Sequence, residues 1–210
     1  MQTSGDTAHG FFDLNLSKRS RIAVFIAALL LVPTFFLPLW TMTLYSNQFP
    51  DGLHLDIYSY KLAGAKTPER DDLREINTLN HYIGMRPLLE SDFAEFVWMP
   101  LVIGFFIIFA LRTVVFAKMS NLIDNAALFL YFGLFSFWSF NNRLYAYGHN
   151  LDPTAPVKVP PFTPTLFGSK QLANFTVYSL PGPASYFMVA FFVALVIAIL
   201  LTRRPSRGMS

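Results

Sequence analysis

Three of the four histidines lie in polar segments between apolar blocks, and two of them have a further metal donor close by in sequence. Met85 follows His81 by four residues, Asp152 follows His149 by three, and His54 stands alone. Imidazole and thioether ligands together suit cuprous copper, which prefers soft donors. A zinc site made of the three histidines and Asp152 is chemically consistent as well. These five residues are the candidate metal ligands, and both metals stay open.

Several other kinds of chemistry are excluded or disfavoured. The chain contains no cysteine, which excludes disulfides, thiolate metal sites, cysteine nucleophiles and c-type haem attachment. None of the apolar blocks contains a histidine, so we expect no b-type haem. No nucleophile elbow, phosphate-binding loop or metalloprotease helix is found, which favours a role other than catalysis, and we expect no nucleic-acid partner. The alternative for the histidines is that they are only hydrogen-bonding groups of surface loops.

The elements that must position these residues are set by the apolar blocks. The chain is 53% hydrophobic and 14% charged, whereas a soluble domain carries nearer a quarter charged residues. The apolar residues gather into four blocks about as long as a bilayer is thick, at about residues 22–45, 93–116, 122–142 and 184–202. We therefore predict an all-α membrane protein, a four-transmembrane-helix bundle that forms a single membrane domain over residues 1–210. The first helix should be kinked or broken near Pro33 or Pro38.

The charged residues predict the orientation of this bundle. Eight basic residues lie in the N-terminal tail, at or near the link between the second and third blocks and in the C-terminal tail, against three acidic residues. The two long loops carry eight basic and nine acidic residues, and Glu95 at the start of the second block is the tenth acidic residue on that side. The positive-inside rule therefore predicts cytoplasmic tails at 1–21 and 203–210, and outer-face loops at 46–92 and 143–183. We expect a multi-pass protein of the bacterial inner (cytoplasmic) membrane, with both termini in the cytoplasm and the lipid bilayer as a partner.

Both long loops are predicted to be partly structured. Apolar residues recur at helical spacing through the segment 68–84, so we expect a short helix that Asp71 or Asp72 caps and that ends at Gly84. Met85 then lies just beyond the last regular turn. In the second loop, five prolines between positions 153 and 164 exclude a helix and predict an extended segment.

Four outer-loop segments carry a resemblance to known proteins: Gln48-Phe-Pro-Asp-Gly-Leu53, Ile76-Asn-Thr-Leu-Asn-His-Tyr-Ile-Gly-Met85, Tyr147-Gly-His-Asn-Leu-Asp-Pro153 and Gly168-Ser-Lys-Gln-Leu-Ala-Asn-Phe175. They resemble a poorly characterised family of bacterial multispan membrane proteins with an Asn-His-Tyr-Ile-Gly-Met motif in an outer loop. That family is associated with nitrous oxide reductase and copper gene neighbourhoods. The resemblance implies a periplasm-facing accessory protein that binds copper at His81, Met85 and His149.

Two functional hypotheses follow. The first is a membrane accessory protein that binds or delivers copper for a respiratory metalloenzyme. In that protein His81 and Met85 of one loop meet His149 of the other, and His54 or Met42 completes the site. The second is a structural or assembly subunit of a larger respiratory or other membrane complex. Such a subunit has no metal of its own and has other membrane or periplasmic proteins as its partners.

Overall fold

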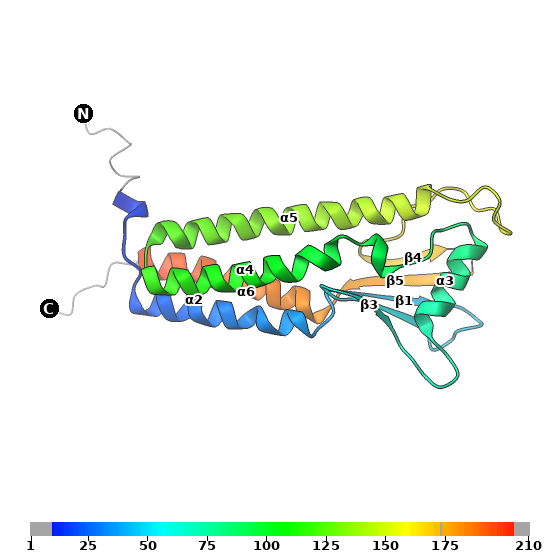
Figure 1. Cartoon of the computed structure of the whole chain (residues 1–210), viewed down its shortest axis with the longest axis horizontal. Coiled ribbons are helices and arrows are strands. Elements are labelled where there is room, and N and C mark those ends of the chain that lie inside the picture. The colour runs from blue at the N-terminus through cyan, green and yellow to red at the C-terminus, as the bar shows by residue number, and fades with distance from the viewer. Residues whose placement is uncertain (1–9, 173, 204–210) are drawn as a thin grey trace, which may run out of the picture. The chain divides into compact units, whose positions relative to one another are not determined.

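The computed structural model describes residues 10–172 and 174–203. Its main elements, in chain order, are α2 (Lys18–Leu30), a 3₁₀ helix (Val32–Phe35), β1 (Trp40–Tyr45), β2 (Leu53–Ile57), β3 (Leu62–Gly64), α3 (Asp72–Tyr82), a second 3₁₀ helix (Glu90–Asp92), α4 (Glu95–Phe116), α5 (Met119–His149), β4 (Gly168–Leu172), β5 (Phe175–Pro181) and α6 (Pro183–Arg203) (Figure 1). Part of the predicted cytoplasmic tails, including Arg204 and Arg207, lies outside the described residues.

The prediction of an all-α four-helix bundle is wrong. The chain contains a five-stranded sheet whose paired strands are all antiparallel. Among the described residues, three helices are long and apolar enough to cross a membrane, namely α4, α5 and α6. They correspond to the predicted spans at 93–116, 122–142 and 184–202, although α5 continues to His149. Three such helices are compatible with a membrane protein.

The predicted first span, 22–45, combines three different elements. Helix α2 has 13 residues, fewer than the roughly 20 that a span requires. A 3₁₀ helix that contains Pro33 follows, so the predicted break near Pro33 is confirmed. From Trp40 onward threonines alternate with larger apolar residues, and this part is strand β1. The error arose because a continuous apolar block was treated as one helix, although the period of two in its last part indicates a strand.

The sheet has the strand order β3-β2-β1-β5-β4, with β1 in the centre. Met42 of β1 pairs with Leu55 of β2 and with Ser179 of β5. Because side chains alternate along a strand, this register separates two faces. We call the face that carries Met42, Leu44, Leu53, Leu55 and Val177 the inner face, and the face that carries Thr43, His54, Asp56 and Tyr178 the outer face.

The chain divides into two compact units. The helical unit contains the described residues up to Thr34, Leu101–Leu134 and those from Tyr186 onward, and the sheet unit contains Phe35–Pro100 and Phe135–Ser185. In the helical unit the Phe129 ring lies 4.6 Å from that of Phe191 and 5.0 Å from that of Phe106, both edge-to-face. Aromatic packing of this kind holds the helices together.

Helix α3 covers the inner face of the sheet. Its residue Ile76 is buried with Leu53 and Leu55 in one core cluster. The predicted helix in this loop is confirmed, with Asp71 as its N-cap. Gly84 follows the helix with φ +78°, a left-handed conformation that favours glycine. The proline-rich segment 153–164 contains no helix, as predicted.

Candidate functional site

The inner face of the sheet bounds an apolar cavity of about 620 Å³ inside the sheet unit. Five parts of the chain contribute to its walls: the sheet, α3, the segment between α3 and α4, the C-terminal end of α5 and the proline-rich segment. Representative lining residues are Leu44, Leu55, Leu79, Leu144, Val159 and Phe162. Segments that are far apart in sequence therefore line one apolar space, which is partly open to solvent.

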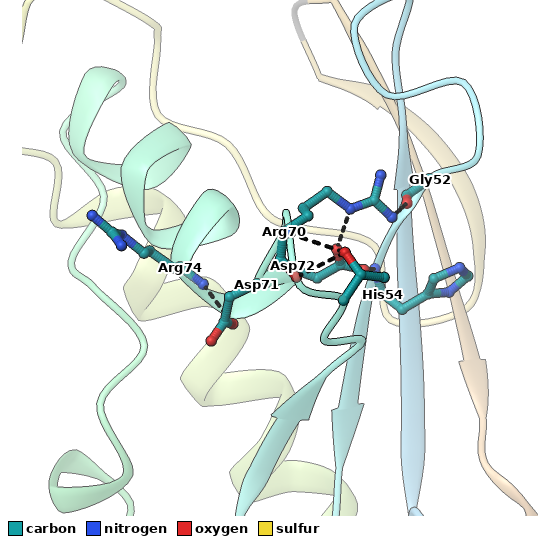
Figure 2. A network of polar contacts seen from close by, with 7 residues as sticks. Gly52, His54, Arg70, Asp71, Asp72 and Arg74 are labelled. Carbon is teal, nitrogen blue, oxygen red and sulfur yellow. Dashed lines mark hydrogen bonds and ion pairs between the residues drawn. The ribbon is translucent and has the colours of Figure 1, made fainter.

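A buried carboxylate positions α3 against the sheet. Asp72, in the first turn of α3, is completely buried, and its Oδ1 lies 2.7 Å from Nε of Arg70. Its Oδ2 accepts a hydrogen bond of 2.8 Å from the backbone N–H of His54 in β2 (Figure 2). Arg70 also donates to the carbonyl of Gly52 at 3.2 Å. This network joins the start of α3 to β2 and to the turn before it, so it holds one wall of the cavity.

The end of α3 is joined to the segment that follows α5. The backbone N–H of Asp152 donates to the carbonyl of Gly84 at 2.8 Å, and that of Val157 donates to the carbonyl of Tyr82 at 3.0 Å. A Cβ added at Gly84 would lie only 2.8 Å from the Asp152 carbonyl oxygen. The close approach therefore requires glycine, in addition to the positive φ. Tyr82 and Val157, which this pairing brings together, both line the cavity.

A second glycine holds the proline-rich segment against α5. The backbone N–H of Phe162 donates to the carbonyl of Gly148 at 3.0 Å. A Cβ at Gly148 would lie 1.8 Å from the Phe162 carbonyl oxygen, so no other residue fits without a shift of the backbone. Phe162 and its neighbours Val159 and Pro164 line the cavity. The proline-rich segment is thus a wall of the cavity rather than a free loop.

A few polar groups interrupt the apolar lining. Asn80 lines the cavity and is only 8% exposed, and no hydrogen bond of its carboxamide is found among the described residues. Tyr147 lines the cavity from α5. Arg143 is paired, because its Nη2 lies 2.8 Å from Oε2 of Glu95. Lys170 is exposed and donates to a backbone carbonyl at 2.9 Å.

The predicted metal ligands are distributed over different parts of the sheet unit. His54 lies on the outer face, where its Nδ1 is 3.3 Å from the Thr43 hydroxyl, and its imidazole extends away from α3 (Figure 2). Its backbone binds Asp72 at the start of α3, whereas His81 lies nine residues further along that helix. Nine helical residues span about 14 Å. His54 and His81 are therefore not brought together.

His81 and Asp152 lie near each other, because the Gly84–Asp152 pairing joins their segments. The hydroxyl and backbone N–H of Thr154 donate to Asp152 at 2.6 and 2.7 Å, and these bonds hold the pKa of that carboxyl below its usual value. The charges of Lys158 and His81 lower this pKa further. Met85 is half-buried and lines the cavity. Met85 lies three residues after Tyr82, the last residue of α3, and so beyond the last helical turn, as predicted.

His149 ends α5 and is held by that helix itself. Its ring stacks on Tyr145 with centroids 3.7 Å apart, and its Nδ1 lies 2.9 Å from the Tyr145 carbonyl oxygen. A carbonyl only accepts hydrogen bonds, so Nδ1 carries the proton, and in neutral imidazole Nε2 keeps its lone pair. Within the described part of the chain, no three His, Asp or Glu side chains gather closely enough to hold a metal ion.

The cavity and its polar residues were missed from the sequence. One sequence signal does indicate the sheet whose inner face forms a wall of the cavity. Residues alternate with a period of two in Trp40–Tyr45, Leu53–Ile57 and Phe175–Pro181, which is typical of strands with one apolar face. The cavity itself has no local signal, because its walls come from segments up to about 130 residues apart. In particular, Asn80 directly precedes His81, and no pattern in the sequence there predicts a buried carboxamide.

No protein-family model, curated protein or solved structure matches this chain.

Proposed function

We propose that this protein is a membrane-anchored binding protein whose sheet unit holds a small apolar ligand of the lipid class. The apolar cavity of about 620 Å³ carries the proposal. Sites for small molecules have volumes of roughly 300–1,000 Å³, are mostly apolar and contain a few polar groups. Apolar walls offer water few hydrogen-bond partners, so an apolar molecule that covers them is favoured over water.

The anchor consists of α4, α5 and α6. Four apolar residues along α4, namely Val97, Leu101, Ile108 and Val115, are between 68% and 74% exposed. A stripe of that kind is suited to contact with lipid. The surrounding bilayer is also a source of hydrocarbon ligands, which supports a lipid as the class that fills the cavity.

The charge distribution supports one orientation. Arg112 and Lys118 lie at the α4–α5 junction, and Arg203 ends α6. By the positive-inside rule we infer that this junction and the C-terminal end of α6 lie in the cytoplasm, and that the two long loops lie on the outer side of the membrane, which is the periplasm in a bacterial inner membrane. Leu16 donates from its backbone N–H to the carbonyl of Ala117 at 2.7 Å, so the N-terminal segment belongs to the cytoplasmic side too.

Ligand binding can be tested with a fluorescent apolar probe, N-phenylnaphthylamine, on the full chain in amphipol. Val159→Trp fills the cavity from the half-buried proline-rich wall. It should weaken probe binding by about tenfold or more. A probe that enters beside the tryptophan side chain overpacks the cavity, and overpacking costs about 1–3 kcal/mol. Leu180→Trp is the matched control, because Leu180 is 51% exposed and does not line the cavity. Equal probe binding by wild type and both variants would refute the proposal.

A second candidate function is copper handling, and the geometry of His149 favours it. Metal-binding histidines usually donate their other ring N–H to a carbonyl or carboxylate, which fixes the ring and the tautomer. His149 makes such a bond to the Tyr145 carbonyl. The other candidate ligands are His81 and Asp152, which do not form a group of three with His149, and Met85 as a soft donor. The further hypothesis of an assembly subunit in a larger complex stays a prediction.

The copper candidate is tested by competition for cuprous ion against a chromogenic chelator. His81→Ala and His149→Ala should each lower the affinity at least tenfold, a typical loss when a metal site loses a positioning or ligating group. His54→Ala should leave the affinity unchanged, since His54 lies on the outer face. If the histidine variants compete as well as wild type, this function is excluded while ligand binding in the cavity remains.

A further inference from the structure

The polar groups in the cavity point to the chemistry of the ligand's polar end. Asn80 is 8% exposed, lines the cavity and comes from α3. A buried carboxamide without a partner costs about 1–3 kcal/mol. Among the described residues no hydrogen-bond partner for it is found, and its side-chain N and O are not sealed from solvent, so water or a ligand reaches it through the cavity.

Tyr147 offers a second polar group to the same space. It lines the cavity from the C-terminal part of α5, and its ring stacks parallel to that of Phe93, with centroids 6.2 Å apart and an interplanar angle of 9°. No hydrogen bond of its hydroxyl is found among the described residues. The ring is half-buried, and the stack on Phe93 restricts its position and therefore that of the hydroxyl oxygen.

The charged residues of the lining disfavour an ionised ligand inside the cavity. Arg143 is already neutralised by Glu95, with Nη2 2.8 and 3.0 Å from its two carboxylate oxygens. Lys170, the other charged lining residue, is exposed. A carboxylate or phosphate that enters an apolar cavity without a partner costs several kcal/mol. A neutral oxygen, in contrast, needs only a hydrogen-bond donor.

We infer that Asn80 and Tyr147 recognise a neutral oxygen, as in an ester, ketone or alcohol, at the polar end of a long-chain ligand. This inference rests on the proposed function, because it assumes that the cavity binds an apolar molecule. The carboxamide N–H and the phenol O–H are both donors, and both groups also accept. They therefore suit a carbonyl and a hydroxyl equally, and neither group can balance the charge of an ionised head.

The experiment measures displacement of N-phenylnaphthylamine by ligands of equal chain length: tetradecane, tetradecanol, methyl tetradecanoate and tetradecanoate. Wild type should bind the alcohol and the ester about tenfold more tightly than the alkane, which corresponds to about 1.4 kcal/mol. Tyr147→Phe and Asn80→Leu should reduce this preference severalfold while affinity for the alkane is kept. Tyr60→Phe is the control, since Tyr60 is 43% exposed and does not line the cavity.

Each outcome separates this inference from the proposed function. If none of the four ligands displaces the probe from wild type, the proposed binding of an apolar ligand is itself refuted. If the alkane displaces it as well as the alcohol does, or if both variants keep the wild-type preference, ligand binding stands and recognition by Asn80 and Tyr147 is refuted. Tighter binding of tetradecanoate than of its ester would also refute it, and would assign the polar end to Lys170. Tyr147→Phe removes a single hydroxyl, so it keeps the test valid should Asn80→Leu fail to fold.

Discussion

The inner and outer faces of the sheet are made by alternate residues of the same strands, yet they have different chemistry. Leu53 and Leu55 on the inner face are 0% and 5% exposed and face the core beneath α3. His54, between them, is exposed on the outer face and contacts Thr43. His54 is therefore a surface group of the sheet, although its residue type made it a candidate metal ligand.

The comparison bears directly on where ligands bind. The inner face is covered by α3, the end of α5 and the proline-rich segment, and these leave an apolar cavity. The outer face carries hydroxyls, a carboxylate and an imidazole. An apolar ligand is therefore expected on the inner face alone. The two faces should therefore differ in their contribution to stability and in their chemistry.

The largest effect is expected at the residue that joins α3 to the inner face. Asp72→Ala leaves the Arg70 guanidinium without its carboxylate and the His54 N–H without its acceptor. Removal of one partner from a buried pair costs about 3–5 kcal/mol. Hydrogen exchange of the α3 amides should accelerate accordingly. Asp71→Ala removes the N-cap bond to Arg74 and the largely exposed ion pair with Lys66, and it should cost about 1 kcal/mol. Equal effects of the two variants would contradict the role given to Asp72.

Truncation of neighbouring residues in β2 compares the faces directly. Leu55→Ala should destabilise the sheet unit by about 2–5 kcal/mol, because it enlarges a cavity in the core. His54→Ala should change the stability by less than about 0.5 kcal/mol, as is usual for surface positions. Pulse proteolysis of the full chain gives both values. A large loss in the His54 variant would show that the outer face is covered.

A smaller loss of stability is expected at Gly84, where the end of α3 approaches the backbone of Asp152 closely. Gly84→Ala puts a methyl group 2.8 Å from the Asp152 carbonyl oxygen and strains a backbone with φ +78°. The cost should be about 1–3 kcal/mol. Because the substitution lies at the wall, binding of the apolar probe should weaken together with the stability. Gly133→Ala is the matched control, since a Cβ there meets nothing within 4 Å. Wild-type behaviour of Gly84→Ala would contradict the close approach.

The smallest effect is a difference in pH dependence between two carboxyls. Burial raises the pKa of Asp56 on the outer face, and the charge of His54 opposes this shift. Asp56 therefore adds stability that is fully present below the unfolded pKa of about 3.9 and is lost as pH rises through the folded value. The pKa of Asp152 is lowered mainly by Thr154, so its contribution is present above about 3.9 and is lost as pH falls through the folded value.

Carbon-detected NMR titration of the two carboxyls checks this pair of signs. The midpoint of Asp56 should lie above that of Asp152. Thr154→Ala should raise the midpoint of Asp152 and leave that of Asp56 unchanged, since Thr154 donates only to the former. Coincident midpoints in wild type would rule out the difference.

Local patterns predicted the parts of the fold that depend on neighbours in sequence. The helix 68–84 was predicted from its apolar spacing, and the structure confirms it as α3 with Asp71 as its cap. Three of the four apolar blocks form helices long enough to span a membrane. The block 22–45 was misread, since hydropathy averaged over its length hides the change of period at Trp40.

The amino-acid sequence by itself determined which segments are apolar enough for a membrane, where α3 begins and ends, and that the proline-rich segment is not helical. Each of these depends on residues within a few turns of one another. Only the tertiary structure decided that His54 faces away from His81, that Gly84 meets Asp152, and that Asn80 and Tyr147 line one cavity. The residues of these pairs are up to 68 positions apart in the sequence. They depend on strand register and on the packing of whole elements, which no local pattern specifies.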